Sequence, residues 1–182
     1  MRAFVAAMAV IAGITSGGTQ EWEKADLATT RLAPSAFPEL PAPIRKDLAR
    51  RGCTIPQPFN ATHVNVISGR FTSAKQTDWA VLCSIKRTSS ILVFRSGSPA
   101  AVAELASQPD LSALQVVSTG VVGYSRALGV ANADFIRVHH QRYGGPKPPP
   151  LDHDGINDIF IEKGSVVLYW YRGRWLGLTG SN

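Results

Sequence analysis

The residues best suited to chemistry lie in one short acidic stretch, Asp152-His153-Asp154-Gly155-Ile156-Asn157-Asp158. Carboxylates close together around a glycine suit a hard cation such as Ca²⁺, because several oxygen ligands must converge at a sharp turn. In the calcium pattern D-x-N-x-D-G-x-x-D, Asp152, Asp154 and Asp158 match the later positions. The first position falls on Pro150, which has no side-chain oxygen. These three aspartates are therefore candidate metal ligands for calcium, and the alternative is a turn in which they accept backbone hydrogen bonds.

The same stretch also contains groups that a hydrolase uses. His153 and Asp154 can complete a Ser–His–Asp set with Ser125, because such triads are assembled in space and not along the chain. The surrounding residues, Gly123-Tyr124-Ser125-Arg126-Ala127, lack the last glycine of the G-x-S-x-G nucleophile motif. A periplasmic hydrolase that uses Asp152, His153 and Asp154 is one alternative interpretation of this region.

The two cysteines, Cys53 and Cys83, permit only one intramolecular pairing. Such a pair is typical of a protein that folds in an oxidising compartment. A Cys53–Cys83 bond would stabilise the fold by roughly 3–4 kcal/mol in the chain-entropy model. The alternative is two separate buried thiols, since Cys83 ends the apolar run Trp79–Cys83.

The start of the chain has the three parts of a secretory signal peptide. Arg2 precedes an uninterrupted apolar run over residues 3–12, and the small residues Ser16-Gly17-Gly18 follow. The run is too short to cross a bilayer, which takes about 20 apolar residues. We therefore expect residues 1–18 to be a signal peptide, the protein to be exported to the periplasm or secreted, and no membrane span to remain after cleavage. An N-terminal membrane anchor and a frayed helix of a cytosolic protein are the alternatives.

The chain has 182 residues and a formal net charge of +6 at pH 7. A basic excess can indicate nucleic acid, anionic lipid or an acidic cell-wall polymer as partner. The positive charges are dispersed, apart from one group with Asp47 among its members: Arg45, Lys46, Arg50 and Arg51. Dispersal and export argue against nucleic acid. The expected partner is another protein or a component of the cell envelope.

Composition along the chain predicts one domain of the α+β class, dominated by strands and built on antiparallel hairpins. Residues 19–35 are polar and mixed, which is typical of a flexible N-terminal arm. Residues 36–182 are expected to form the domain itself.

Two short helices are predicted within the domain. Pro43 suits a first helical turn and Gly52 a helix end, so we expect a helix near residues 43–51. Pro99 opens a second expected helix near residues 99–106.

Apolar runs rich in β-branched residues predict the strands. The clearest form two similar hairpins about 80 residues apart, in which an aspartate leads into the first strand and a serine opens the second: Asp78–Leu82 with Ser90–Phe94, and Asp158–Ile161 with Ser165–Tyr169. Three further strands are expected: Leu114–Val117, Ala127–Val130 and Phe135–Val138.

Four segments of the chain resemble a group of uncharacterised exported bacterial proteins: Arg51–Gln57, Asn65–Phe71, Asp78–Ser84 and Asp152–Ile156. The resemblance extends over most of the chain after the expected signal peptide. It implies export but no activity, because that group has no assigned function.

A local resemblance links one segment to the FG-GAP or VCBS blades of β-propellers. Gly69-Arg70-Phe71 and Asp78-Trp79-Ala80-Val81 are similar to the start and the second element of such a blade. The resemblance implies a calcium loop between the two, but residues 73–77 contain no carboxylate, so a calcium role is not carried over here.

The absence of a complete catalytic motif favours a non-enzymatic exported domain that binds a partner or an envelope component. The alternatives are the periplasmic hydrolase and a calcium-stabilised module, and both centre on the stretch Asp152–Asp158.

Overall fold

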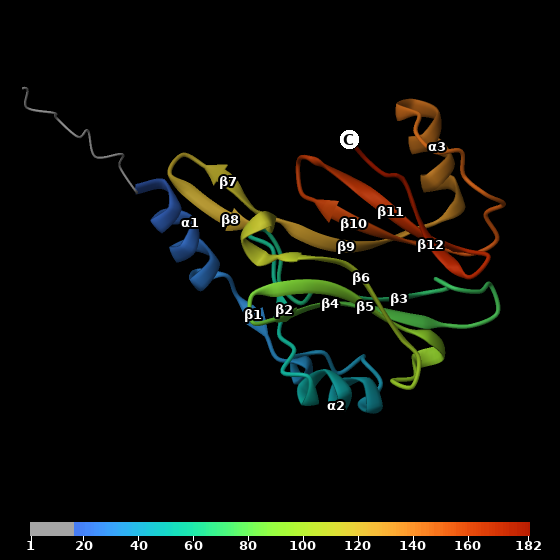
Figure 1. The fold of residues 1–182 in the computed structure, drawn as a ribbon, viewed down its shortest axis with the longest axis horizontal. Coiled ribbons are helices and arrows are strands. Elements are labelled where there is room, and N and C mark those ends of the chain that lie inside the picture. Colours follow the sequence, from blue (N-terminus) through green and yellow to red (C-terminus); the bar gives the residue numbers. More distant parts are fainter. Residues whose placement is uncertain (1–16) are drawn as a thin grey trace, which may run out of the picture.

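The computed structural model describes residues 17–182 (Figure 1). The expected signal peptide therefore lies outside the described residues, except for Gly17 and Gly18, which begin the first helix. Within the described range, none of the helices is both long and apolar enough to cross a membrane.

Two four-stranded antiparallel sheets lie face to face at the centre of the molecule (Figure 1). The first sheet contains, in spatial order, β3 (Val66–Gly69), β4 (Asp78–Ile85), β5 (Thr88–Phe94) and β6 (Val102–Pro109). The second contains, in spatial order, β12 (Arg174–Thr179), β11 (Gly164–Tyr171), β10 (Gly155–Phe160) and β9 (Arg126–Ala131). The two similar hairpins expected from the sequence are β4–β5 and β10–β11, one in each sheet. The predicted α+β, strand-dominated fold built on antiparallel hairpins is confirmed.

The main hydrophobic core fills the space between the sheets. Successive side chains of a strand point to opposite faces, so alternate residues reach this core. Both sheets supply buried apolar side chains to it: Ala80, Leu82, Ile91 and Val93 from the first, and Leu128 and Ile156 from the second. Burial of apolar area at about 25 cal/mol per Å² is the largest favourable contribution to such a sandwich.

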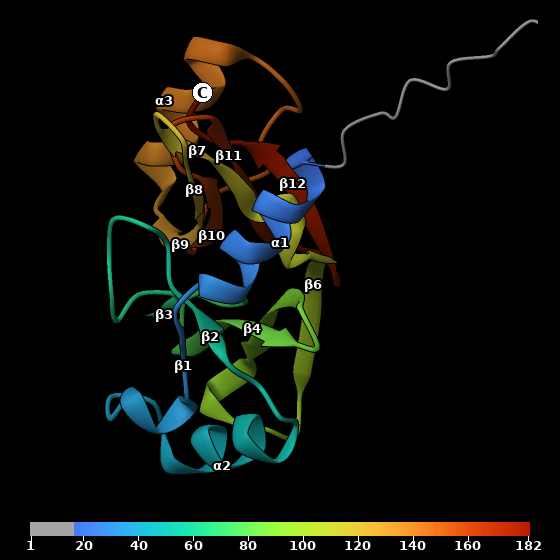
Figure 2. The ribbon, with the colours of Figure 1, turned by 90° about the vertical axis from the view of Figure 1, so that its left-hand side faces the viewer.

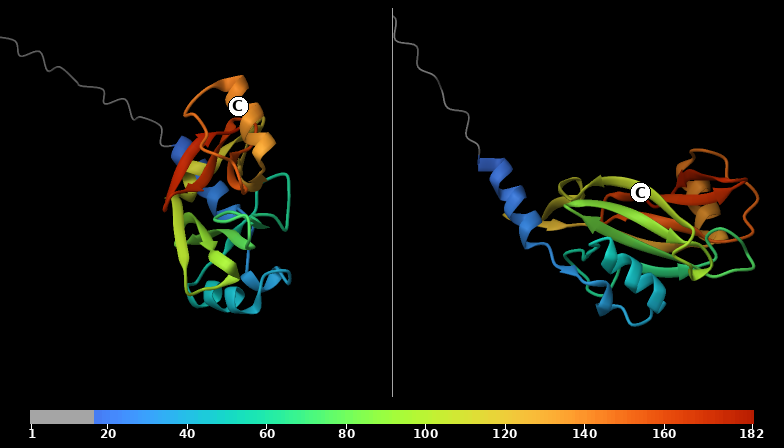
Figure 3. Two further views of the ribbon diagram at one scale, coloured as in Figure 1. Left: turned by 90° about the vertical axis from the view of Figure 1, so that its right-hand side faces the viewer. Right: turned by 60° about the horizontal axis from the view of Figure 1, so that its bottom comes forward.

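Each outer face of the sandwich is covered by one helix, and Figures 2 and 3 show these helices on opposite sides of the stack. Helix α2 (Ala42–Arg50) packs Ile44 and Leu48 on the first sheet, and this confirms the helix expected near residues 43–51. Helix α3 (Ala133–Tyr143) packs Ile136 on Val167 and Tyr169 of the second sheet.

The remaining elements lie at one end of the sandwich (Figure 1). They are α1 (Gly17–Ala28), the two-stranded pairs β1 (Arg31–Leu32) with β2 (Ile55–Pro56) and β7 (Leu114–Ser118) with β8 (Val121–Tyr124), and the 3-10 turn η3 (Asp110–Ala113). The 3-10 turn η1 (Pro34–Ala36) lies beside α2 instead, where Ala36 packs against the core on the outer face of the first sheet. A third turn, η2 (Arg95–Gly97), follows β5. The strand expected at Leu114–Val117 is β7, and the strand expected at Ala127–Val130 lies within β9.

Residues 19–35, which we expected to form a flexible arm, contain most of α1 together with β1 and the start of η1. Asp26 of α1 forms ion pairs with Arg31 and with Arg87, the latter at 2.7 Å. Arg31 also pairs with the buried Asp110 at 2.7 Å. This stretch is therefore attached to the sandwich by ion pairs.

The prediction of a helix near residues 99–106 is wrong, because the segment from Val102 onwards forms strand β6. It pairs with β5, and the inner-face side chains Ala103 and Leu105 pack against the core between the sheets. The strand expected at Phe135–Val138 is also wrong. Asn132 caps α3 there, since its side-chain oxygen accepts a hydrogen bond from the Phe135 N–H at 2.8 Å.

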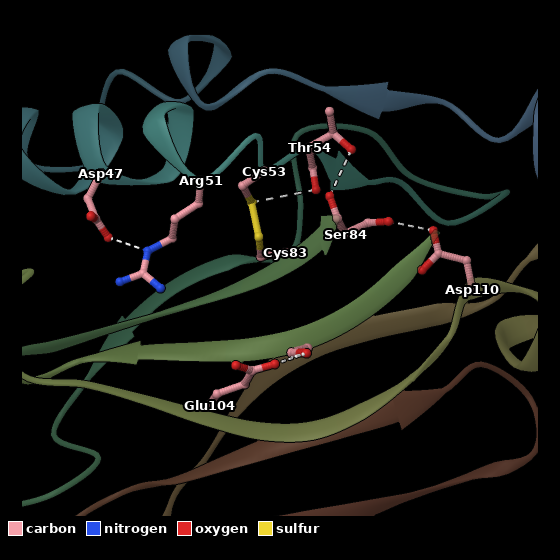
Figure 4. Close-up of a disulfide and its surroundings, with 9 residues drawn as sticks. Asp47, Arg51, Cys53, Thr54, Cys83, Ser84, Glu104 and Asp110 are labelled. Atoms are coloured by element: carbon pink, nitrogen blue, oxygen red, sulfur yellow. Dashed lines mark hydrogen bonds and ion pairs between the residues drawn. A yellow bond between two sulfur atoms is a disulfide. The ribbon is translucent and has the colours of Figure 1, made fainter. Parts of the chain in front are cut away.

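The Cys53–Cys83 disulfide is confirmed, and it ties the end of α2 to the middle of the first sheet (Figure 4). The two Cα atoms are 5.4 Å apart, and the residues are only 3% and 2% exposed. Next to the bond, Thr54 and Ser84 exchange backbone hydrogen bonds of 3.0 and 2.8 Å. The bond is therefore a buried structural staple.

Candidate functional site

The predicted metal stretch leads into strand β10, where its three carboxylates have different surroundings. Asp154 contacts Arg70 at the end of β3: its Oδ2 accepts hydrogen bonds from the Arg70 backbone N–H at 3.1 Å and from Nε at 3.3 Å. The backbone N–H of Asp154 in turn donates to the Arg70 carbonyl at 2.9 Å. Asp154 thus joins the two sheets.

His153 is buried and stacks on Tyr169, with ring centroids 4.3 Å apart and an interplanar angle of 7°. Its Nδ1 lies 3.0 Å from the Asp154 carbonyl oxygen, and its Nε2 lies 2.9 Å from that of Trp170. Both ring nitrogens therefore face backbone oxygens, and neither is open to a metal ion or to a substrate proton.

Asp152 lies at the surface, with 78% of its side chain exposed. The Tyr169 hydroxyl donates to the Pro150 carbonyl at 3.2 Å and lies 3.3 Å from the Asp152 carboxylate. Burial raises the pKa of Tyr169, although hydrogen bonds from the Asp152 and His153 backbone act in the opposite direction. Tyr169 is therefore neutral, and its hydroxyl group holds the loop at Pro150 and Asp152.

The structure does not bring Asp152, Asp154 and Asp158 to a common point. The Asp158 carboxylate forms an ion pair with Arg126 and does not lie with the other two carboxylates. Within residues 17–182, no group of three His, Cys, Asp or Glu side chains is placed to hold a metal ion. Ser125, the third member of the expected triad, is buried and donates its hydroxyl to the Gly123 carbonyl at 3.2 Å.

The loop between β3 and β4 lies in the segment that resembles a propeller blade, and hydrogen bonds to Asp78 hold it in place. This carboxylate is fully buried and accepts hydrogen bonds from the Thr72 N–H and hydroxyl, at 2.8 and 2.7 Å. The Gln76 amide and the Ser96 N–H supply two more, at 2.7 and 2.8 Å. Asp78 thus organises the loop as an acceptor for the protein's own N–H and O–H groups.

Two cavities flank the elements discussed so far. One of about 230 Å³ lies beside the predicted stretch, between Arg70, the start of α3 and Asp152–Asp154. Another of about 450 Å³ lies between α1, residues 57–62 and β8. The latter is lined by uncharged side chains, and its Tyr124 has a pKa raised by burial and a hydroxyl 3.4 Å from that of Ser89.

A third cavity, of about 440 Å³, opens between the two sheets and contains a buried ion pair. We call it the inter-sheet cavity. Arg126 of β9 has only 2% of its side chain exposed. Its Nε and Nη2 each lie 2.8 Å from one oxygen of Asp158. Its other donors contact the first sheet, at the Ser89 carbonyl and hydroxyl and at the Ala106 carbonyl. All five N–H groups of the guanidinium are thus satisfied.

The backbone is distorted where it meets this arginine. Ala106 has φ 48°, in the left-handed region that alanine rarely adopts. The β5–β6 register shifts between Ser89 and Ile91, opposite this residue, as in a β-bulge. The bulge directs the Ala106 carbonyl to Arg126, 2.9 Å from Nη2. Local strain of this kind concentrates at functional sites.

The far wall of the inter-sheet cavity is formed by the start of β11 and the last residues of the chain. The Ser165 N–H donates to the Ser181 carbonyl at 2.7 Å, and the Ser181 N–H donates to the Ser165 hydroxyl at 2.8 Å. A Cβ on Gly180 would lie 2.1 Å from the Ser165 hydroxyl oxygen, so only glycine permits this close approach. The wall is therefore fixed in position.

The sequence pattern groups Asp158 with Asp152 and Asp154, whereas its partner in the structure is Arg126, which no motif singles out. An arginine at the start of a short strand looks like a surface charge, because burial depends on the partner sheet. The chain matches no family model, no curated protein and no solved structure.

Proposed function

We propose that this chain is an exported domain that binds a component of the cell envelope without acting on it chemically. The observation that carries this proposal is the inter-sheet cavity with the Arg126–Asp158 pair in its lining. Every donor of the arginine is engaged, which suits a rigid binding surface. The sequence features of residues 1–18, the buried disulfide and the net charge of +6 support an envelope location.

The hydrolase alternative has less support. A general base must reach the proton that it removes, and a nucleophile must be within hydrogen-bond distance of that base. Both nitrogens of His153 lie within 3.0 Å of backbone carbonyl oxygens, and the Ser125 hydroxyl donates to the Gly123 carbonyl. These contacts favour binding over hydrolysis.

Binding is tested by co-sedimentation of the exported protein with purified cell-wall sacculi. We expect saturable binding that weakens as salt increases, because the protein is basic. Protein that stays in the supernatant at all concentrations, at low salt, contradicts the proposal.

Export is tested separately by N-terminal sequencing of protein recovered from a bacterial host. We expect a mature form in the periplasm or medium that begins near residues 17–19. Recovery of uncleaved protein from the cytoplasm alone contradicts the expected export.

A further inference from the structure

We propose that the inter-sheet cavity binds a sugar unit that carries a carboxylate. This inference rests on the proposed function and names the chemical class of its ligand. It follows from the hydrogen-bonding capacity, the charge, the walls and the rigidity of the cavity.

The cavity presents a hydrogen-bond acceptor, the Asp158 carboxylate. Each oxygen of Asp158 accepts one hydrogen bond from Arg126, and a carboxylate oxygen has a second lone-pair site. The Asp158 side chain is 17% exposed and lines the cavity. Arg126 fixes the position of the Asp158 carboxylate, so this carboxylate is a preorganised acceptor for ligand hydroxyl groups.

Three further polar side chains share the cavity lining with Asp158. Gln108 of β6, Ser112 of η3 and Lys163 of the β10–β11 turn all line the cavity. Among the contacts of residues 17–182, none of these three side chains has a hydrogen bond or ion pair to the protein. Together they offer amide, hydroxyl and ammonium groups, a mixture of donors and acceptors that suits a ligand rich in hydroxyl groups.

The lining side chains carry one uncompensated positive charge. Among the lining side chains, Arg126 and Asp158 neutralise each other, and Lys163 supplies the remaining positive charge. The exposed ammonium group of Lys163 in this lining favours an anionic ligand group. A carboxylate on the sugar meets this requirement.

The cavity also has the size of a small-molecule site and a partly apolar lining. Its volume of about 440 Å³ lies within the roughly 300–1,000 Å³ of small-molecule sites. Phe160 and Val166 add apolar surface to the lining. Ring C–H groups of a sugar pack on such surface while its hydroxyls face the polar side chains.

Isothermal titration calorimetry tests the inference. The dissociation constant of the wild-type protein is measured for a uronic acid oligomer and for a neutral N-acetylglucosamine oligomer of the same length. We expect the uronic acid oligomer to bind at least tenfold more tightly. A poly-glutamate peptide of the same charge is the control for general attraction to anions, and we expect it to bind at least tenfold more weakly than the uronic acid oligomer.

A matched pair of variants locates the site. Lys163→Ala changes the turn of the β10–β11 hairpin, and Lys86→Ala changes the corresponding turn of the β4–β5 hairpin, outside the cavity. Both lysines are exposed, so both variants should fold. We expect Lys163→Ala to weaken uronic acid binding at least tenfold and Lys86→Ala to change it less than twofold.

Several outcomes overturn the inference. If the neutral and acidic oligomers bind equally well, the ligand needs no carboxylate. If poly-glutamate binds as tightly as the uronic acid oligomer, the ligand need not be a sugar. If the two lysine variants have equal effects, the ligand does not bind in the inter-sheet cavity. If neither oligomer binds but the protein still sediments with sacculi, this inference fails and the proposed function stands. Loss of sacculus binding as well contradicts both.

Discussion

Arg126 and Asp158 form a two-point ion pair in the second sheet, and the same guanidinium donates to Ser89 and Ala106 of the first sheet. One side chain thus connects both layers of the sandwich. A buried charge that loses its partner is costly, because the remaining group keeps its desolvation penalty without compensation.

Replacing this arginine should therefore destabilise the protein strongly. We expect Arg126→Leu to lower the free energy of unfolding by about 3–5 kcal/mol, since Asp158 is left without its cation. Urea denaturation followed by tryptophan fluorescence measures the change. Arg137→Leu is the control: its pair with Asp134 is exposed, so the loss should stay below about 1 kcal/mol. Similar losses in both variants would contradict a structural role for the buried pair.

The disulfide should contribute a measurable part of the stability. Cys53 and Cys83 are separated by 30 residues, and the chain-entropy model assigns about 3.5 kcal/mol to a loop of that length. We expect the Cys53→Ala, Cys83→Ala double variant to lose about 2–4 kcal/mol in urea denaturation. Reductant should then lower the stability of the wild type and leave the double variant unchanged. A wild type as unstable as the variant under oxidising conditions would argue against the bond.

Tyr169 should give the fold a dependence on alkaline pH. Burial raises the pKa of Tyr169 in the folded state, so folded protein holds this proton more tightly than unfolded protein, whose tyrosines titrate near pH 10. Its contribution is therefore complete below about pH 10 and is lost as pH rises further. We expect wild type to exceed Tyr169→Phe in stability by about 1 kcal/mol at pH 8, with the difference shrinking towards pH 11. A constant difference across this range would contradict the assignment.

Calcium should leave the melting temperature unchanged. An ion that binds only the folded state raises that temperature, but Asp154 and Asp158 are engaged with Arg70 and Arg126. We expect no shift in a thermal melt at millimolar calcium. A rise that Asp154→Ala abolishes would restore the calcium-stabilised module that the sequence suggests.

Local signals predicted the parts of the fold that depend on neighbouring residues. Pro43 and Gly52 mark the ends of α2, and alternating apolar residues mark the β4–β5 and β10–β11 hairpins. Two cysteines leave one intramolecular pairing, which the structure contains.

Segments whose state is set by distant partners were predicted poorly. Strand β6 contains good helix formers such as Ala103 and Leu105, and its pairing with β5 overrides their preference. Helix α3 contains the β-branched residues Ile136 and Val138, yet the Asn132 cap and packing on the second sheet decide its conformation. The same limit applies to the inter-sheet cavity, because no local signal shows that Arg126 is buried.

The position of the Cys53–Cys83 bond also determines how the protein responds to a change of redox environment. Because α2 and the first sheet enclose both sulfur atoms, a small thiol reaches them only while the helix is detached. The bond, once formed, therefore survives in a mildly reducing medium for as long as the helix stays in place. The rate at which the disulfide is reduced therefore reports the rate at which α2 detaches from the first sheet.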